Sequence, residues 1–439
     1  MLGYVGRQEP AKILFKRKNS LRRSKILICL AVVSFVGKIL VNDSSKYTGV
    51  VASKSTFTVL FSVVFLDNLG FAIVVPYLYF FVRFLGGSTL LYGILLVSYS
   101  LMSFIFTPLV ARFSDHYGRR KILLVALAVS SFAYFIFGAS QVIWLLFLGR
   151  MLSGTTAATV PVAQAYVADV TTPNQRLRYL GLLGAAAGIA FILGPAIGGT
   201  LSSLFGYAVP SYLACALAFT NLVSAYFLLP EPTSFNIKRT VLSFRALLNV
   251  LRKRKIVLLL AIYFLFFVSF VFLQASLSPW LQAVFGFGAL QTGLIFFFFG
   301  AISVFTQAIM LPALGKRFTR LNLTLIGIAF LAGGLLTLSI VPNLAVMMVV
   351  TAVLSFGFGI QIVTLNTLIS TNTPENAQGG ALGVAWAIAG LAQTTAPVLA
   401  ATAFSIGISA GFDGLAFAIS AAISVATIPL VMALKKVSI

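Results

Sequence analysis

The chain consists largely of apolar segments of about 20 residues separated by short polar loops, and this repetition restricts its fold more than any other feature. A helix of that length spans the hydrocarbon core of a bilayer and satisfies its own backbone hydrogen bonds there. Only 9% of the residues are charged and 60% are hydrophobic, whereas soluble domains carry about 25% charged residues. The sequence therefore excludes a soluble fold and predicts an all-α membrane protein.

Twelve such segments are predicted, six on each side of a polar stretch. The predicted spans are residues 56–80, 90–111, 122–140, 142–168, 178–203, 208–229, 256–278, 290–314, 322–341, 343–370, 380–404 and 412–434. We expect two six-helix bundles, at 55–229 and 256–439, joined by a basic linker at 230–255. Two sets of six spans around a linker are typical of transporters built from two parallel repeats.

A weak internal repeat supports this division. Gly181 and Pro195 in the fifth span have the same separation as Gly383 and Pro397 in the eleventh, since 195 − 181 and 397 − 383 are both 14. Gly and Pro are common in membrane helices, so the match has weight only because it falls at equivalent positions of the two halves.

Lysine and arginine are distributed unevenly among the loops. They occupy the loops after spans 2, 4, 6 and 8 and the C-terminal tail, whereas the loops after odd-numbered spans hold only Arg83. By the positive-inside rule both termini and the even-numbered loops are predicted to be cytoplasmic. The net charge of +23 is thus spread over alternate loops. A nucleic-acid binder is excluded because it gathers its basic residues on one accessible surface.

Residues 1–54 form a basic extension whose only acids are Glu9 and Asp43. Its apolar stretch, 26–37, is short for a membrane span. We favour a cytoplasmic or interfacial segment that contacts anionic lipid. A targeting peptide, a thirteenth span and an upstream extension of the true start remain open.

Asp67 is the only one of the eight acids that falls at membrane depth, near the middle of the first span. An ionised carboxylate there costs about 2.5–3.5 kcal/mol on insertion scales, and such residues usually mark a proton or ion path. We therefore predict that Asp67 loads and releases protons as access to it alternates. The alternative is a carboxyl that only hydrogen-bonds to a neighbouring helix.

Arg150 is the one basic residue in the interior of a span. Counted from opposite surfaces, Asp67 lies about 16 Å and Arg150 about 12 Å into a core of about 30 Å, so the two are predicted at nearly the same height. Arginine keeps its proton and needs a partner. We hypothesise an Asp67–Arg150 pair that breaks when Asp67 is protonated; the alternative is that Arg150 snorkels to the outer surface.

The loop after the second span reads Asp115-His-Tyr-Gly118-Arg119-Arg120. Gly118 permits a tight turn, and Asp115 and Asp169 can flank Arg119 in a charge cluster. This loop resembles the signature of the major facilitator superfamily, Asp-x-x-Gly-Arg-Arg. The resemblance implies the twelve-helix major facilitator fold and a cytoplasmic latch formed by Asp115, Gly118, Arg119, Arg120 and Asp169. Ala111 departs from the family glycine, and the second half lacks the acid before Gly315-Lys316-Arg317.

Three further segments strengthen the resemblance. Arg150-Met-Leu-Ser-Gly154 is similar to a family motif whose arginine is implicated in proton transfer, and Asp67-Asn-Leu-Gly70 resembles the first span of twelve-span drug:proton antiporters. The segment 188–199 resembles the antiporter motif. Its matching residues are Gly188, Gly194, Pro195, Gly198 and Gly199. Within this group the chain is similar to tetracycline/proton antiporters, through Asp169, Glu231, Gln274 and Gln307 among others.

Polar and aromatic residues within the spans are candidates for the wall of a substrate cavity. Those expected to bind substrate are Asn68, Tyr77, Tyr99, Gln274, Gln307, Gln361, Asn366, Trp386 and Gln393, with Tyr134 and Gln164 as further lining residues. The second half has no membrane-embedded charge, since Asp413 lies at the outer entrance of the twelfth span, so amphiphilic or cationic organic substrates are expected. For each residue the alternative is a hydrogen bond between helices. The phenylalanines at 296–299 are expected to face lipid.

These patterns predict a proton-coupled exporter of small organic molecules, of multidrug or tetracycline type, in the plasma membrane. We expect a monomer whose partners are substrate, protons and lipid, without cofactor or metal; Cys29, Cys215 and His116 cannot build a metal cluster or disulfide framework. A sugar or metabolite symporter or facilitator is the alternative transporter. A non-transporting receptor or scaffold is the alternative of another class. An enzyme is not expected, because no nucleophile–base pair or phosphate loop can be assembled.

Overall fold

The computed structural model describes residues 54–231, 253–340, 343–374 and 377–438, and within these ranges all regular secondary structure is helical. Twelve helices or helix pairs are long and apolar enough to cross a membrane. The predicted all-α fold with twelve membrane-spanning helices is thus confirmed. The predicted extension, up to residue 53, and residues 232–252 of the linker lie outside the described residues.

We call α2–α8 the first lobe and α10–α17 the second lobe. The first lobe contains α2 (Lys54–Phe84), α3 (Thr89–Tyr117), α4 (Arg119–Gly138), α5 (Ile143–Thr155), α6 (Thr159–Val170), α7 (Pro173–Phe205) and α8 (Ala208–Leu228). The second contains α10 (Arg254–Phe285), α11 (Ala289–Phe305), the π-helical segment η1 (Thr306–Met310), α12 (Leu311–Leu314), α13 (Arg320–Leu338), α14 (Leu344–Thr371), α15 (Gln378–Ser409), α16 (Leu415–Val425) and α17 (Thr427–Ser438).

Three of the predicted spans are not continuous α-helices, and each changes shortly before a proline. The fourth divides into α5 and α6 before Pro161, the eighth passes through η1 before Pro312, and the twelfth divides at Ala426 before Pro429. Proline lacks the N–H that would bond to the carbonyl four residues earlier, so the hydrogen-bond ladder is locally free to change. Hydropathy alone does not detect these breaks, because the apolar character continues through them.

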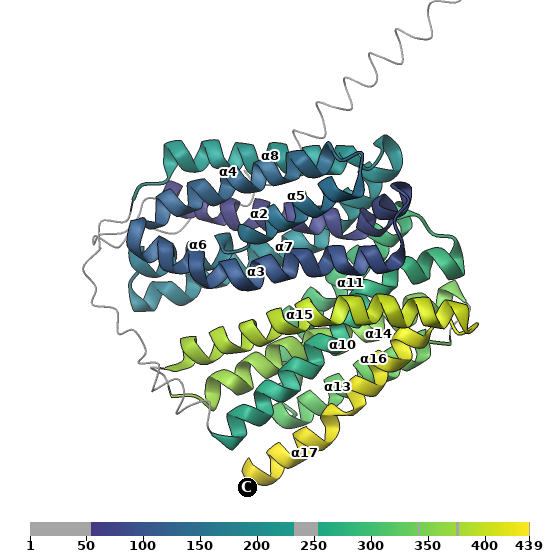
Figure 1. Cartoon of the computed structure of the whole chain (residues 1–439). Coiled ribbons are helices and arrows are strands. Elements are labelled where there is room, and N and C mark those ends of the chain that lie inside the picture. Colours follow the sequence, from purple (N-terminus) through teal and green to yellow (C-terminus); the bar gives the residue numbers. More distant parts are fainter. Residues whose placement is uncertain (1–53, 232–252, 341–342, 375–376, 439) are drawn as a thin grey trace, which may run out of the picture. The chain divides into compact units, whose positions relative to one another are not determined.

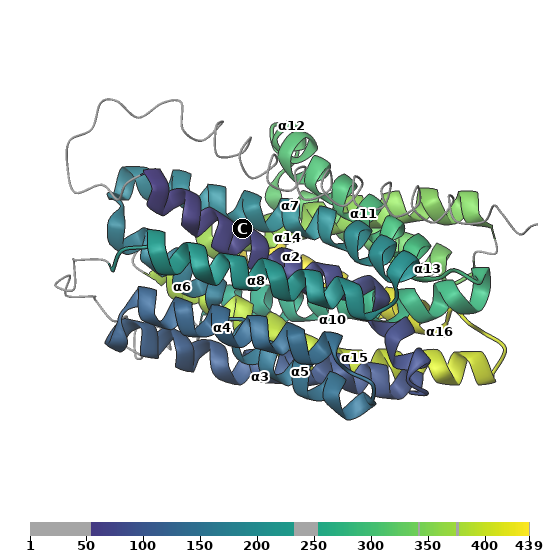
Figure 2. The same cartoon turned by 90° about the horizontal axis from the view of Figure 1, so that it is seen from above.

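The two lobes pack through two helix pairs. Within the first lobe α4 packs along α8 and α5; within the second, α10 packs along α15 and α16, and α13 along α14. Between the lobes α7 lies along α11, and α3 lies along α15 (Figures 1 and 2). We call the end of the bundle that carries Arg119, Arg120, Arg176 and Lys316 the basic end. The end where α7 finishes and α11 begins is the opposite end.

The α7–α11 pair is tight at the opposite end and separates toward the basic end. A Cβ built on Gly199 would lie 3.0 Å from the Cα of Gly293, and one built on Gly300 would lie 3.5 Å from the Cα of Ile192. A Cβ on Gly188 would lie 3.9 Å from a methyl of Val304, and one on Gly184 would meet nothing within 4 Å. These glycines of α7 share one helix face. The two helices therefore diverge along their length.

The α3–α15 pair diverges in the same direction. Near the opposite end, a Cβ on Gly93 would lie 2.8 Å from the Cβ of Ala401. Closer to the basic end, a Cβ on Gly390 would lie 3.3 Å from the ring of Phe104, and one on Gly383 would meet nothing within 4 Å. The lobes are thus closed against each other at the opposite end and apart at the basic end.

Candidate functional site

Asp67 lies on the face of α2 that points into the first lobe. It is half-buried, and Gly70 and Phe71 follow it on the same helix face. The Phe71 ring lies 5.0 Å from the Tyr99 ring of α3 and 6.1 Å from the Phe191 ring of α7. The carboxyl is therefore surrounded by interior helices, two of which carry the contacts between the lobes, and not by lipid.

Arg150 of α5 is buried among aromatic rings. Its side chain is 3% exposed, and its guanidinium carbon lies 4.7 Å from the centroid of Tyr99 and 5.6 Å from that of Phe71. A cation over an aromatic face is attracted by the ring quadrupole, more strongly when water is excluded. Its Nε atom has no hydrogen-bond partner among the described residues. The alternative in which Arg150 snorkels to the surface is wrong.

The hypothesised Asp67–Arg150 ion pair is absent from this conformation. Within the described ranges the recorded ion pairs are those of Arg119. Phe71, one turn after Asp67, contacts Arg150, so the predicted common height agrees with the structure. Depth arithmetic places residues along the bundle but leaves the rotation of each helix undetermined, and the guanidinium of Arg150 lies against the rings of Phe71 and Tyr99.

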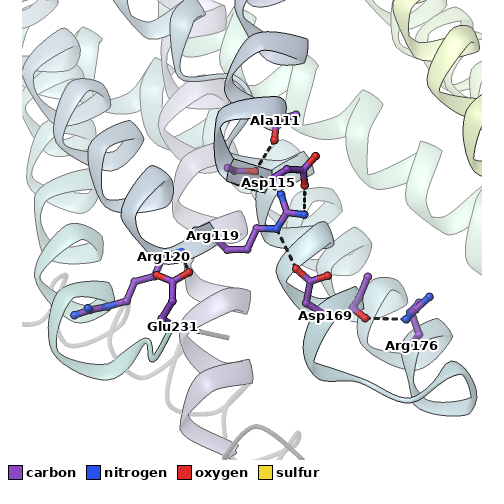
Figure 3. Close-up of polar contacts among 9 residues, drawn as sticks. Ala111, Asp115, Arg119, Arg120, Asp169, Arg176 and Glu231 are labelled. Carbon is purple, nitrogen blue, oxygen red and sulfur yellow. Dashed lines mark hydrogen bonds and ion pairs between the residues drawn. The ribbon is translucent and has the colours of Figure 1, made fainter. Parts of the chain in front are cut away.

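The loop signature forms a charge cluster at the basic end (Figure 3). The guanidinium of Arg119 pairs with Asp115 within α3 and, through Nε at 3.0 Å, with Asp169 at the end of α6. It also donates to the hydroxyl of Ser114. Gly118, which joins α3 to α4, has a φ of 104°, a conformation that glycine adopts without strain. The predicted partners of Arg119 are brought together, and these contacts all lie within the first lobe.

Glu231, for which no role was predicted, also joins the charged groups at the basic end. Its carboxylate accepts from the backbone N–H of Arg120 at 3.4 Å, at the start of α4, where the helix dipole favours an anion. A Cβ on Gly118 would lie 2.6 Å from the same oxygen. The Arg120 side chain donates to the carbonyl of Tyr226 at 2.6 Å, and the hydroxyl of Tyr166 donates to that of Pro230. The start of the linker is thus bound to the loop signature, 111 residues away in sequence.

The glycines of the antiporter motif on α7 serve two interfaces. A Cβ on Gly194 would lie 2.9 Å from the carbonyl carbon of Ala72, and one on Gly198 would lie 2.8 Å from that of Ile73, so these two admit α2. Gly199 and the carbonyl of Pro195 instead adjoin Gly293 of α11. One short motif therefore allows α7 to pack closely both against α2 of its own lobe and against α11 of the other lobe.

An aromatic cluster occupies the second lobe. The Phe270 ring stacks on Phe358 of α14 at 4.2 Å, and Phe299 of α11 lies 5.7 Å from Phe358. Trp386 of α15 is 56% exposed and lies edge-on to Phe267 at 6.2 Å. Phe299 packs against other rings, so the prediction that residues 296–299 face lipid is wrong for this residue.

The predicted cavity residues divide into two groups in this conformation. Half-buried or exposed are Asn68, Tyr99, Gln164, Gln274, Gln307, Asn366, Trp386 and Gln393. Tyr77 is fully buried and its hydroxyl lies 2.7 Å from that of Ser211, while Gln361 is 1% exposed and donates to the carbonyl of Thr324. These two side chains face neighbouring helices of their own lobes, which corrects their placement on the cavity wall. Tyr134 is also buried and reaches Gly70 of α2, so its placement as a lining residue is corrected as well.

Local hydrogen bonds also tie two of the half-buried amides to their own helices. The amide of Asn68 donates to the carbonyl of Val64 at 2.7 Å. The amide of Gln307, inside η1, donates to the hydroxyl of Ser303 at 3.0 Å. In Asn366 of α14 the side-chain oxygen is buried without a hydrogen-bond partner in the described part of the chain. Of these amides, Asn366 has the clearest unused capacity to bind a ligand.

Fold and site together define a membrane protein of two six-helix lobes, with a half-buried carboxyl inside the first lobe and a charge cluster at one end. The profile of the Major Facilitator Superfamily matches residues 60–397. The chain belongs to the major facilitator superfamily.

The chain is similar to bacterial resistance proteins over most of its length. It is 31% identical to the class D tetracycline resistance protein of Salmonella ordonez, covering 77% of this chain and 87% of the relative. It is 29% identical to the class C tetracycline resistance protein of Escherichia coli, covering 86% of this chain and 96% of the relative. Multidrug resistance protein 2 of Bacillus subtilis is 26% identical, covering 81% and 90%.

A solved structure, that of the human organic anion transporter MFSD10, shares the fold. It superposes with a TM-score of 0.63 at 22% sequence identity and covers 86% of this chain and 99% of that one. At this identity the likeness concerns the fold alone.

Proposed function

We propose that this protein is a proton-coupled carrier that exports small amphiphilic organic molecules by alternating access. The similarity to tetracycline and multidrug resistance proteins supports this class of substrate. The observation that carries the proposal is Asp67, a half-buried carboxyl inside a lobe whose interface is closed at one end and open at the other. A carboxyl in that position can exchange protons with whichever side has access.

The orientation follows from the basic loops. With the basic end in the cytoplasm, the conformation described here faces inward, and both termini are cytoplasmic in the plasma membrane. The protein acts as a monomer and as a carrier, not an enzyme. Its basic extension contacts anionic lipid, and the linker joins the two lobes.

The cluster around Arg119 acts as a latch in the other half of the cycle. In the inward-facing conformation its bonds are satisfied within the first lobe. When the basic ends of the lobes approach, the exposed carboxylate of Asp115 can exchange Arg119 for a partner on the second lobe. The cluster then stabilises the outward-facing conformation, while Gly199 and Gly293 stabilise the inward-facing one.

Substrate binds between the lobes. Tyr99 and Asn68 contribute from the first lobe, and the aromatic cluster with Trp386 contributes from the second. Aromatic walls with few polar groups suit planar amphiphilic molecules. Gln274, Gln307, Asn366 and Gln393 are the polar groups proposed to orient the substrate.

The test is transport in proteoliposomes with an imposed pH gradient, using tetracyclines and lipophilic dyes. We expect gradient-driven uptake by the wild type and loss of the pH dependence in Asp67→Asn. The matched control is Asp413→Asn, the same substitution at a loop acid, which should transport normally. Movement of substrate that ignores the gradient would favour a facilitator, and movement of no compound would favour a scaffold.

A further inference from the structure

The hydroxyl of Tyr134, on α4, reaches the face of α2 that carries Asp67. A Cβ built on Gly70 would lie 3.0 Å from this hydroxyl and 3.1 Å from the ring atoms Cε2 and Cζ. Helical side chains lean toward the N-terminus of their helix, so the space that the hydroxyl fills at Gly70 borders on Asp67, one turn earlier. Any side chain at position 70 would displace Tyr134, and Gly70 therefore admits the hydroxyl.

Arg150 is brought to the same turn of α4 by close helix packing. A Cβ on the preceding residue, Gly149, would lie 3.1 Å from the carbonyl of Ala133 and 3.1 Å from the Cβ of Phe137. Ala133 directly precedes Tyr134 in sequence, and Phe137 follows it by three residues, less than one helical turn. Because α5 rests on α4 at this turn, Arg150 and Tyr134 lie at the same height.

A second contact fixes α5 against α3. A Cβ on Gly154 would lie 2.5 Å from the backbone carbonyl of Tyr99. The guanidinium of Arg150 is held over the face of Tyr99 at 4.7 Å, at the height of the turn of α4 that carries Tyr134. Tyr99 presents its π face to the cation. Tyr134 is the residue whose hydroxyl extends to α2.

Both tyrosines belong to the same cluster of side chains as Asp67 and Arg150: the Tyr99 ring lies against Phe71 and Arg150, and the Tyr134 hydroxyl lies against Gly70. The charged or titratable groups that face this site from the surrounding helices are Tyr99 of α3, Tyr134 of α4 and Arg150 of α5, with Tyr77 of α2 and Tyr92 of α3 near Arg150. From α7 the contact is the ring of Phe191, and from α8 it is the amide of Asn221, which donates to Val63 at 3.4 Å. No direct ion pair links Asp67 and Arg150 within the described residues.

We propose that Tyr134 is a positioning residue that transmits the protonation state of Asp67 to Arg150. This proposal rests on the proposed role of Asp67 as the proton site. When Asp67 is ionised, the Tyr134 hydroxyl donates to the carboxylate, and its oxygen accepts from the guanidinium of Arg150, whose Nε is without a partner here. When Asp67 takes a proton from water it becomes a weaker acceptor and releases the hydroxyl. Tyr134 keeps its proton throughout. Only its hydrogen bonds change, and with them the strength of the contact between α2 and α5.

The proposal is tested by titrating Asp67 directly in the purified protein. Its carboxyl band in infrared spectra is identified by difference from Asp67→Asn and followed against pH in the wild type and in Tyr134→Phe, which keeps the ring and removes one oxygen. We expect the midpoint to rise by about one pH unit, because the ionised carboxylate loses a donor. Tyr212→Phe, whose hydroxyl lies on α8 toward the opposite end, should leave the midpoint unchanged.

Gly70→Ala supplies a second variant, because its methyl group displaces the hydroxyl without removing it. We expect a shift in the same direction, and no further shift when Gly70→Ala is combined with Tyr134→Phe. A midpoint in Tyr134→Phe within about 0.2 pH units of wild type, or additive shifts in the double variant, would overturn the proposal. Since this titration needs no substrate, a shift without any transport by the wild type would reject the proposed function and keep the link to Tyr134.

Discussion

Gly199→Ala tests the conclusion that α7 and α11 close the opposite end of the bundle. The added methyl would overlap the backbone of Ala289 and lie 3.0 Å from the Cα of Gly293. Backbone atoms cannot move aside as a flexible side chain can, so the two helices must separate or bend. Overpacking of this kind costs about 1–3 kcal/mol.

This cost falls on one conformation only. The contact exists where the opposite end is closed, and it is lost when that end opens. The gain in helix propensity from Gly to Ala, about 1 kcal/mol, applies to both conformations and cancels. Since 1.4 kcal/mol corresponds to a factor of ten, Gly199→Ala should shift the equilibrium away from the closed conformation by roughly 5- to 150-fold.

The assay is a distance measurement between spin labels at Ser203 of α7 and Leu294 of α11, both exposed near the opposite end, in a background with Cys29 and Cys215 replaced by serine. We expect one short distance in the parent protein and a second, longer distance that becomes dominant in Gly199→Ala. Gly188→Ala is the matched control, since its methyl would lie at an ordinary 3.9 Å from Val304. An unchanged distance distribution in Gly199→Ala, or the same change in Gly188→Ala, would refute the reasoning.

Three further predictions follow from the site. Gly118→Ala should lower the thermal unfolding temperature in detergent more than Gly206→Ala does. Both glycines have a positive φ, but only a Cβ at position 118 would also meet Glu231, at 2.6 Å. An equal fall in unfolding temperature for the two variants would contradict the contact with Glu231. Arg150→Lys keeps the charge but loses the planar stack on Tyr99, and gradient-driven uptake should fall about tenfold; wild-type uptake would argue against the stack. Phe358→Ala should destabilise the second lobe by about 1–3 kcal/mol, because the ring is half-buried, seen as a lower unfolding temperature, and an unchanged temperature would refute its packing role.

Much of the fold was predictable because hydropathy is a property of each segment by itself. The twelve spans agree with the helices, and the loop signature correctly predicted that Asp115 and Asp169 meet Arg119. The breaks before Pro161 and Pro429 were not predicted, because other prolines, such as Pro195, lie inside continuous helices. Whether a proline interrupts a helix depends on what neighbouring helices do with the freed carbonyl.

The candidate site was predictable in composition but not in geometry. Asp67 and Arg150 stand out because charge within an apolar segment is rare. The direct pair between them is absent from this conformation, and Tyr77, Gln361 and Tyr134 are buried and do not lie on a cavity wall. These differences have one cause: sequence position gives the height of a residue in the bundle, whereas the rotation of its helix decides what it faces. Glu231 had no assigned role because its contact with Arg120 crosses 111 residues.

The sequence by itself determined that this chain is a membrane protein with twelve apolar spans between residues 56 and 434 and one acid at depth, since the transfer of each segment into lipid depends on that segment alone. Only the tertiary structure decided that Arg150 lies against the rings of Phe71 and Tyr99, that Gly70 admits Tyr134, and that the lobes close at the end opposite the basic loops. These features depend on how pairs of helices turn toward each other. The structural role of a glycine or a tyrosine is not defined until its neighbour across the helix interface is known.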